Sequence, residues 1–98
     1  MANMIHVMAT IVVKPEHAVA AKGLLIELAA SSRGEAGCLG YELFQRPDAP
    51  HSFQTVEQWR GQADVDAHMK TPHVAAAIAA AGQMFAAPPA IHAFAKIG

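Results

Sequence analysis

Four stretches of the chain combine β-branched, aromatic or alternating apolar residues with flanking turn sequences, a pattern typical of β-strands. They are residues 4–13, 38–46, 51–59 and 91–97. Only a short turn rich in Pro and Asp separates the second stretch from the third, so these two are expected to pair as an antiparallel hairpin. The first stretch has apolar residues on both of its faces, and we therefore expect both faces to be covered.

The segments between these strands have the spacing of amphipathic helices. Residues 15–32 place an apolar stripe on one side of a helix, formed by Ala21, Leu24, Leu25, Leu28 and Ala29. A shorter helical pattern begins at Gly61, and Thr71-Pro72 then begins another helix as an N-cap and N1 pair. The order β-α-β-β-α-β predicts an α+β, ferredoxin-like domain over residues 1–98, with a four-stranded antiparallel sheet and two helices on one face.

This architecture leaves the second face of the sheet bare unless another molecule covers it. The first strand is apolar on both faces, and only 15% of the chain is charged, which is little for so small a domain. We therefore expect a homodimer in which two sheets pack face to face.

Composition and charge narrow the class of protein. The chain has 98 residues, a formal net charge of −1 and scattered single charges, so no basic stripe suggests nucleic acid as a partner. No apolar stretch is long and uncharged enough to span a membrane, and the N-terminal sequence lacks the regions of a signal peptide. The single cysteine, Cys38, cannot form an internal disulfide, so a reduced, cytoplasmic location is expected.

His68 is the first candidate for chemistry. Val65, His68 and Met69 have i, i+3, i+4 spacing, so the ionisable ring shares one side of a helix with two apolar residues. A structural histidine hydrogen-bonded to a backbone carbonyl is one interpretation. The break at Thr71 favours a functional one, because it could open a pocket above the sheet.

The aromatic residues Tyr41, Phe53 and Trp59 occupy positions of neighbouring strands that could share one face. They could line a cleft for a flat apolar ring, although ordinary core packing is the alternative. Glu57 is in register with Phe53 and Trp59, and an inward-facing carboxylate would need a partner. The candidates for that partner are Arg60, Lys96 or a group of a second subunit, and an ion pair is the expected arrangement.

The six histidines do not predict a metal site. His68 and His73 are five residues apart, which on a helix rotates them away from a shared face, and the other four lie on different elements. The sequence also contains no phosphate-binding glycine loop, dinucleotide fingerprint or nucleophile elbow. Cys38 is expected to be a small strand residue and not a nucleophile.

Residues 35–74 resemble the antibiotic biosynthesis monooxygenase domain family. The family pattern is matched in order by Glu35, Gly37, Cys38 and Tyr41, by Glu57 and Trp59, by Ala67 and His68, and by Thr71 and His73. The length and the order of elements are similar over essentially the whole chain. The resemblance implies a dimeric α+β barrel, with a cavity between the sheet and the helices of each subunit.

The resemblance also implies a function. Family enzymes include monooxygenases that oxidise small aromatic substrates, such as quinols or polyphenols, with O2 and without metal, flavin or haem. His68 matches the helix histidine of the family, and we expect it to act as proton acceptor or anion stabiliser. Tyr41, Trp59, Phe53 and Glu57 are the predicted substrate-binding residues.

The family also includes proteins with other functions, and the sequence matches these to different degrees. Haem degradation is disfavoured because the first strand has no Asn, His68 replaces the Trp of haem-degrading relatives, and Ile78 stands near the place of their haem ligand. An isomerase or other proton-transfer enzyme on a small oxygenated metabolite remains an alternative, as does a non-catalytic dimeric ligand-binding module. A phosphorylated substrate is disfavoured, because the arginines are scattered along the chain.

Overall fold

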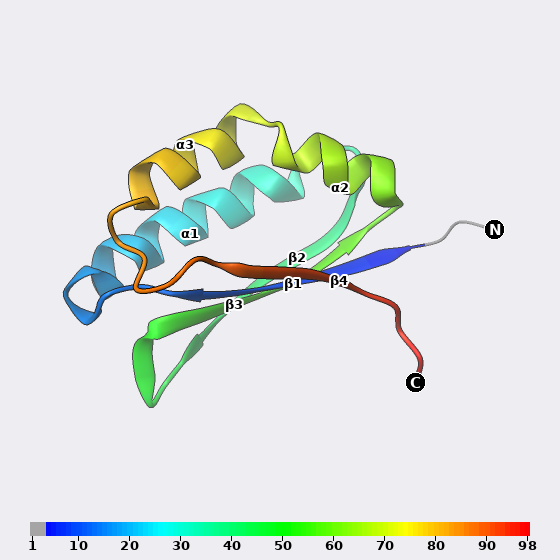
Figure 1. Ribbon diagram of the computed structural model, residues 1–98. Coiled ribbons are helices and arrows are strands. Elements are labelled where there is room, and N and C mark those ends of the chain that lie inside the picture. Colours follow the sequence, from blue (N-terminus) through cyan, green and yellow to red (C-terminus); the bar gives the residue numbers. More distant parts are fainter. Residues whose placement is uncertain (1–3) are drawn as a thin grey trace.

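The computed structural model describes residues 4–98, and it has the predicted order of strands and helices (Figure 1). The strands are β1 (Ile5–Val12), β2 (Cys38–Arg46), β3 (Ala49–Trp59) and β4 (Ala90–Phe94). The helical elements are the 3-10 turn η1 (Pro15–His17), α1 (Ala18–Arg33), α2 (Gln62–Met69) and α3 (Pro72–Ala81).

The strands form one antiparallel sheet in the order β2-β3-β1-β4, and the helices cover one face of it (Figure 1). This is the predicted α+β ferredoxin-like fold. The second helical segment is divided into α2 and α3, as the Thr71-Pro72 break predicted. The hairpin turn is tighter than expected, because Arg46 already pairs with Ala49.

The hydrophobic core lies between the sheet and the helices. Alternate residues of β1 point toward the helices, as their period-two spacing predicts, and they pack against α1. Burying a side chain of the size of Val or Leu stabilises the fold by about 1.5–3 kcal/mol. The buried residues that join β1 and α1 in this way are Val7, Ala9, Ile11, Ala21, Leu25 and Ala29.

Leu39 departs from the predicted pattern. Regular alternation along residues 38–46 would place it on the same face as Tyr41, but it is 56% exposed, whereas Tyr41 is buried. A register shift between Cys38 and Gly40 explains the difference, because the irregularity takes Leu39 out of the alternation. Tyr41 thereby lies opposite Glu57 on the helix-covered face.

Between residues 4 and 98, no helix has both the length and the apolar character needed to cross a bilayer.

Candidate functional site

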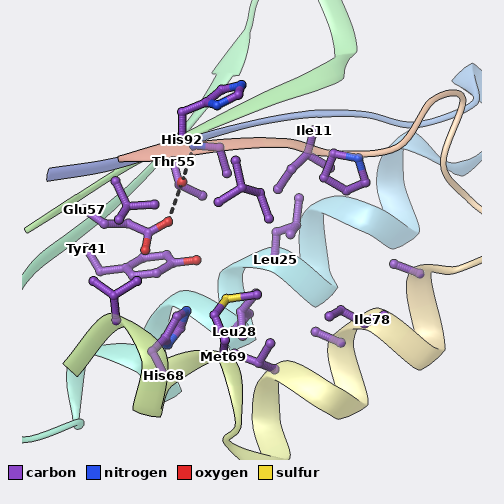
Figure 2. Close-up of a pocket in the computed structure, with 18 of the residues that line it drawn as sticks. Ile11, Leu25, Leu28, Tyr41, Thr55, Glu57, His68, Met69, Ile78 and His92 are labelled. Carbon is purple, nitrogen blue, oxygen red and sulfur yellow. Dashed lines mark hydrogen bonds between the residues drawn. The ribbon is translucent and has the colours of Figure 1, made fainter. Parts of the chain in front are cut away.

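A cavity of about 320 Å³ lies between the helices and the sheet face that they cover (Figure 2). This volume is at the lower end of the range typical of small-molecule sites, roughly 300–1,000 Å³. Its walls are mostly aliphatic, and no Lys or Arg of residues 4–98 lines it. The few polar side chains among the lining residues are those of Tyr41, Thr55, Glu57, His68 and His92.

The polar groups gather at one end of the cavity, where Tyr41, Glu57 and His68 lie close together (Figure 2). The ring centroids of Tyr41 and His68 are 6.1 Å apart. His92 points away from the helices in Figure 2, because its pairing with Met8 places it on the other face of the sheet. The cavity therefore combines one polar end with a long apolar wall.

Glu57 is 4% exposed and accepts hydrogen bonds from two residues of its own strand. The Thr55 hydroxyl donates to Oε2 at 2.6 Å, and the Trp59 indole N–H donates to Oε1 at 3.0 Å. Residues at i±2 share one face of a strand, so β3 itself supplies both donors. The backbone N–H of Ala9 in turn donates to the Thr55 hydroxyl at 3.0 Å, which joins this network to β1.

Glu57 does not form the predicted ion pair with Arg60 or Lys96, its two candidate partners within the chain. No cation of residues 4–98 pairs with its carboxylate, which is held by neutral donors instead. Arg60, one of the candidate partners, makes a two-bond contact with Asp64 on the exposed side, at 2.8 and 3.1 Å. Lys96, the other, follows β4 and is exposed.

His68 is 5% exposed and lines the cavity, which confirms that it faces inward. Its partner is a carboxylate and not the backbone carbonyl of the structural interpretation, since Nδ1 lies 2.7 Å from Glu35 Oε2. When Nδ1–H donates to this carboxylate, the neutral ring carries its lone pair on Nε2. The Trp59 ring packs against the imidazole with centroids 4.5 Å apart and fixes its plane.

His73 reaches the same carboxylate oxygen, with Nε2 2.8 Å from Glu35 Oε2. The expectation that His68 and His73 diverge is therefore wrong, because the helix is interrupted between them. The Thr71 hydroxyl donates to the His68 carbonyl at 2.8 Å and accepts from the Val74 N–H at 3.3 Å, which ends one helix and caps the next. This break turns both imidazoles toward Glu35.

Glu35 is the member of this candidate site that the pattern of residue types along the chain did not single out. It lies in the loop between α1 and β2, and its side chain is largely buried. The signal that could have found it is its place in the Glu-x-Gly-Cys segment. Gly37 of this segment has its own role, because a methyl group there would overlap the side chain of Asp64 at the start of α2. The missing side chain lets α2, which carries His68, pack directly on this loop.

The ionisation of Tyr41 and Cys38 follows from their burial. Burial, and then the negative charge of Glu57, raises the pKa of the Tyr41 hydroxyl well above its usual value. Tyr41 is therefore a neutral hydrogen-bond donor near pH 7, and its hydroxyl points into the cavity (Figure 2). Burial also raises the pKa of the Cys38 thiol, which agrees with a packing role.

The structure separates the four predicted substrate-binding residues into two groups. Tyr41 and Glu57 line the cavity, as expected. Phe53 is 1% exposed and belongs to the core cluster around Ile11, and Trp59 is 0% exposed behind His68. Neither Phe53 nor Trp59 lies on the cavity wall, so these two do not make the predicted contact with a substrate and instead support the residues that could.

Comparisons with known proteins agree with the fold described above. The family model described as antibiotic biosynthesis monooxygenase matches residues 4–80, a span that includes Glu35, Glu57, His68 and His73. The protein named "Putative monooxygenase YcnE" of Bacillus subtilis is 31% identical over 85 residues, which is 87% of this chain and 90% of that protein. The protein sll1783 of Synechocystis is 35% identical over 60 residues, which is 61% of this chain but 39% of that protein. The crystal structure of PA3566 from Pseudomonas aeruginosa has a TM-score of 0.92 at 33% identity and covers 100% of this chain and 98% of its own.

Proposed function

Because this chain belongs to the antibiotic biosynthesis monooxygenase family, we propose that it oxidises a small aromatic substrate, such as a quinol or polyphenol, with O2 and without a resident cofactor. The observation that carries this proposal is the position of the His68 ring in the cavity and its hydrogen bond with Glu35. Its ring lines an apolar cavity, and in the neutral tautomer that donates Nδ1–H to Glu35 the lone pair lies on Nε2. A base in such a place can remove the proton of a phenolic hydroxyl.

Proton removal is the step that this proposal assigns to the protein. His68 Nε2 takes the phenolic proton, and the carboxylate of Glu35 stabilises the imidazolium that forms. The neutral Tyr41 hydroxyl donates a hydrogen bond to the substrate oxygen as it becomes negative. The aliphatic walls keep water from the anion, which makes the ring a better electron donor.

The electrons for oxygen reduction come from the substrate. In the simplest case, a ring C–H of the phenolate becomes a carbonyl with one atom of O2. The other atom leaves as water, with two hydrogens of the substrate. The ring is oxidised by four electrons and O2 is reduced by four, so no further reductant is needed.

The cavity also favours uncharged substrates. No lysine or arginine of residues 4–98 lines it, so neither residue type offers a fixed positive charge to a substrate that enters as an anion. A phosphorylated metabolite normally requires several cations or backbone donors around the phosphate. An isomerase acting on such a compound is therefore a poorer match to this site than an oxidation of a neutral phenol.

Oxygen consumption tests the proposed reaction. The purified protein is mixed with a panel of hydroquinones, naphthohydroquinones and anthrones, and the rate is compared with spontaneous oxidation of each compound. We expect uptake that is proportional to protein concentration, and one labelled atom in the product when 18O2 is used. Uptake no faster than the spontaneous rate for every compound would reject the proposal for this substrate class. Turnover that continues without O2 would favour the proton-transfer alternative.

We also propose that two copies pair through the sheet face opposite the helices. Phe44 is 52% exposed, and the cross-strand pair Met8 and Val56 also lies on this face. Exposed apolar groups gathered on one face are typical of an interface. Sedimentation velocity is expected to show a dimer that Phe44→Glu dissociates. Ile26→Glu, at a position 51% exposed on α1, is the matched control and should stay dimeric. A wild-type monomer at all concentrations would contradict the pairing.

A further inference from the structure

We propose that Glu35, His68 and His73 form a binding site for a divalent transition metal of the zinc class, on the side of His68 that faces away from the cavity. The candidate ligand atoms are Glu35 Oε2, His68 Nδ1 and His73 Nε2, and they all lie within 4.8 Å of one another. They come from the α1–β2 loop, the last turn of α2 and the first turn of α3. A metal here would hold these segments together.

The donor set suits zinc. Zn²⁺ binds imidazole nitrogen and carboxylate oxygen in a tetrahedral arrangement, and a site with three protein ligands leaves the fourth position to water. Ligand atoms about 2.0–2.1 Å from a tetrahedral metal are roughly 3.3 Å apart. Glu35 Oε2 is now 2.7 Å from Nδ1 of His68 and 2.8 Å from Nε2 of His73. The carboxylate would therefore need to move away from each ring by roughly half an ångström, and the two imidazole nitrogens, which lie within 4.8 Å of each other, would need to adopt the same spacing of roughly 3.3 Å.

A path from solvent reaches these atoms. The side chains of Glu35 and His73 are 15% and 27% exposed, whereas that of His68 is 7% exposed. A groove between α1 and α3 includes Glu27, Ser31 and His73, so a cation can approach beside an acidic residue. His68 would be the inner ligand, and His73 and Glu35 the outer ones.

The position of a bound metal relative to the cavity determines which chemistry it could support. A donor set of two histidines and one carboxylate also suits Fe(II) in oxygenases, where open positions face the substrate. Here the metal would sit at Nδ1, and the imidazole ring itself would separate it from the cavity. Direct activation of O2 on a cavity-bound substrate is therefore not expected from this site, and a redox-inert ion such as Zn²⁺ is its match.

Metal binding would change the protonation pattern of His68. A neutral imidazole bound to a metal through Nδ1 carries its proton on Nε2, so the nitrogen facing the cavity could donate a hydrogen bond but not accept a proton. Zn²⁺ would then suppress the oxidation, and a chelator would restore it. This consequence rests on the proposed function, whereas the binding itself does not.

Calorimetric titration of the chelator-treated protein with Zn²⁺ tests the binding without any substrate. We expect one Zn²⁺ per chain. The affinity for Zn²⁺ should fall at least about 10–100-fold in Glu35→Gln and in His73→Gln, because even the mutation of a residue that only hydrogen-bonds to a metal ligand costs about this much. His17→Gln is the control, because this histidine precedes α1 and lies outside the cluster. Equal binding by all variants would assign the metal to adventitious surface sites and overturn the proposal, as would the absence of binding.

A measurement on the wild-type protein covers the case in which a variant fails to fold. Imidazole 15N NMR during the Zn²⁺ titration should shift Nδ1 of His68 and Nε2 of His73 and leave the other histidines unchanged. Shifts confined to other histidines would overturn the site. Binding at this site without any oxidation of the aromatic panel would reject the proposed function alone, and oxidation without binding would reject the metal site alone.

Discussion

His68→Gln is expected to lower the rate of protein-dependent O2 uptake by about 10²–10⁴-fold, the usual contribution of a positioned general base. Glutamine has a polar side chain of similar reach, and its amide can still donate to Glu35 in place of Nδ1–H. It cannot accept a proton at the position of Nε2. The turnover rate at substrate saturation should therefore decrease. It is measured with an oxygen electrode, using the substrate of the panel that the wild type oxidises fastest.

Two controls separate catalysis from folding in this experiment. His17→Gln removes a histidine at the opposite end of α1 from Glu35 and should leave both turnover and thermal stability unchanged. His68→Gln should melt within a few degrees of the wild type, because the contact with Glu35 is kept. A folded His68→Gln protein with near-wild-type turnover would contradict the assignment of His68 as the base. Loss of turnover that only accompanies unfolding would assign His68 a structural role.

The fold was largely predictable from local patterns. The period-two spacing of β1 and the short turn between β2 and β3 require no knowledge of distant contacts, and both were confirmed. Leu39 shows the limit of this reasoning. A register irregularity inserts a residue into the alternation, and nothing in the apolar pattern around Leu39 distinguishes it from a regular strand position.

The candidate site was predictable only in part. The inward direction of His68 follows from i, i+3, i+4 spacing within one helix, a local property. Its contact with Glu35 joins residues 33 positions apart, and that of His73 with Glu35 joins residues 38 apart. The contact of His68 depends on how α2 packs on the α1–β2 loop, and that of His73 depends on the angle at which α3 leaves the Thr71 break. Sequence spacing does not give this angle, so the continuous-helix assumption separated two histidines that in fact converge.

The aromatic residues show a second limit. Phe53, Glu57 and Trp59 share one face of β3, as predicted, because alternate residues of a strand point the same way. Which of them borders the cavity depends on what the helices place above each position. α2 sets His68 over Trp59, and the core cluster around Ile11 covers Phe53. The alternation of residues along a strand therefore predicts which face of the sheet a side chain lies on, but not whether it borders the cavity or is packed in the core.

Trp59→Ala is expected to reduce the free energy of unfolding by about 3–5 kcal/mol, the range for deleting a fully buried large aromatic side chain. Trp59 is 0% exposed, packs against His68 and donates to Glu57. Domains are commonly stable by only about 5–15 kcal/mol, so this single change removes a large share of the total. Chemical denaturation followed by circular dichroism measures the loss. Val19→Ala, at a position 88% exposed, is the control and should change stability by no more than about 0.5 kcal/mol.

The variant Trp59→Phe separates the contribution of packing to this loss of stability from the contribution of the hydrogen bond to Glu57. Phenylalanine keeps much of the buried aromatic ring but has no N–H, so Glu57 Oε1 loses its donor in a place where water cannot easily replace it. An unsatisfied buried group of this kind costs about 1–3 kcal/mol, or more when it is charged. We therefore expect Trp59→Phe to lie between the wild type and Trp59→Ala. A phenylalanine variant as stable as the wild type would show that Glu57 does not depend on the indole N–H. A variant as unstable as Trp59→Ala would mean that the hydrogen bond, and not the packing beneath His68, accounts for most of what Trp59 contributes.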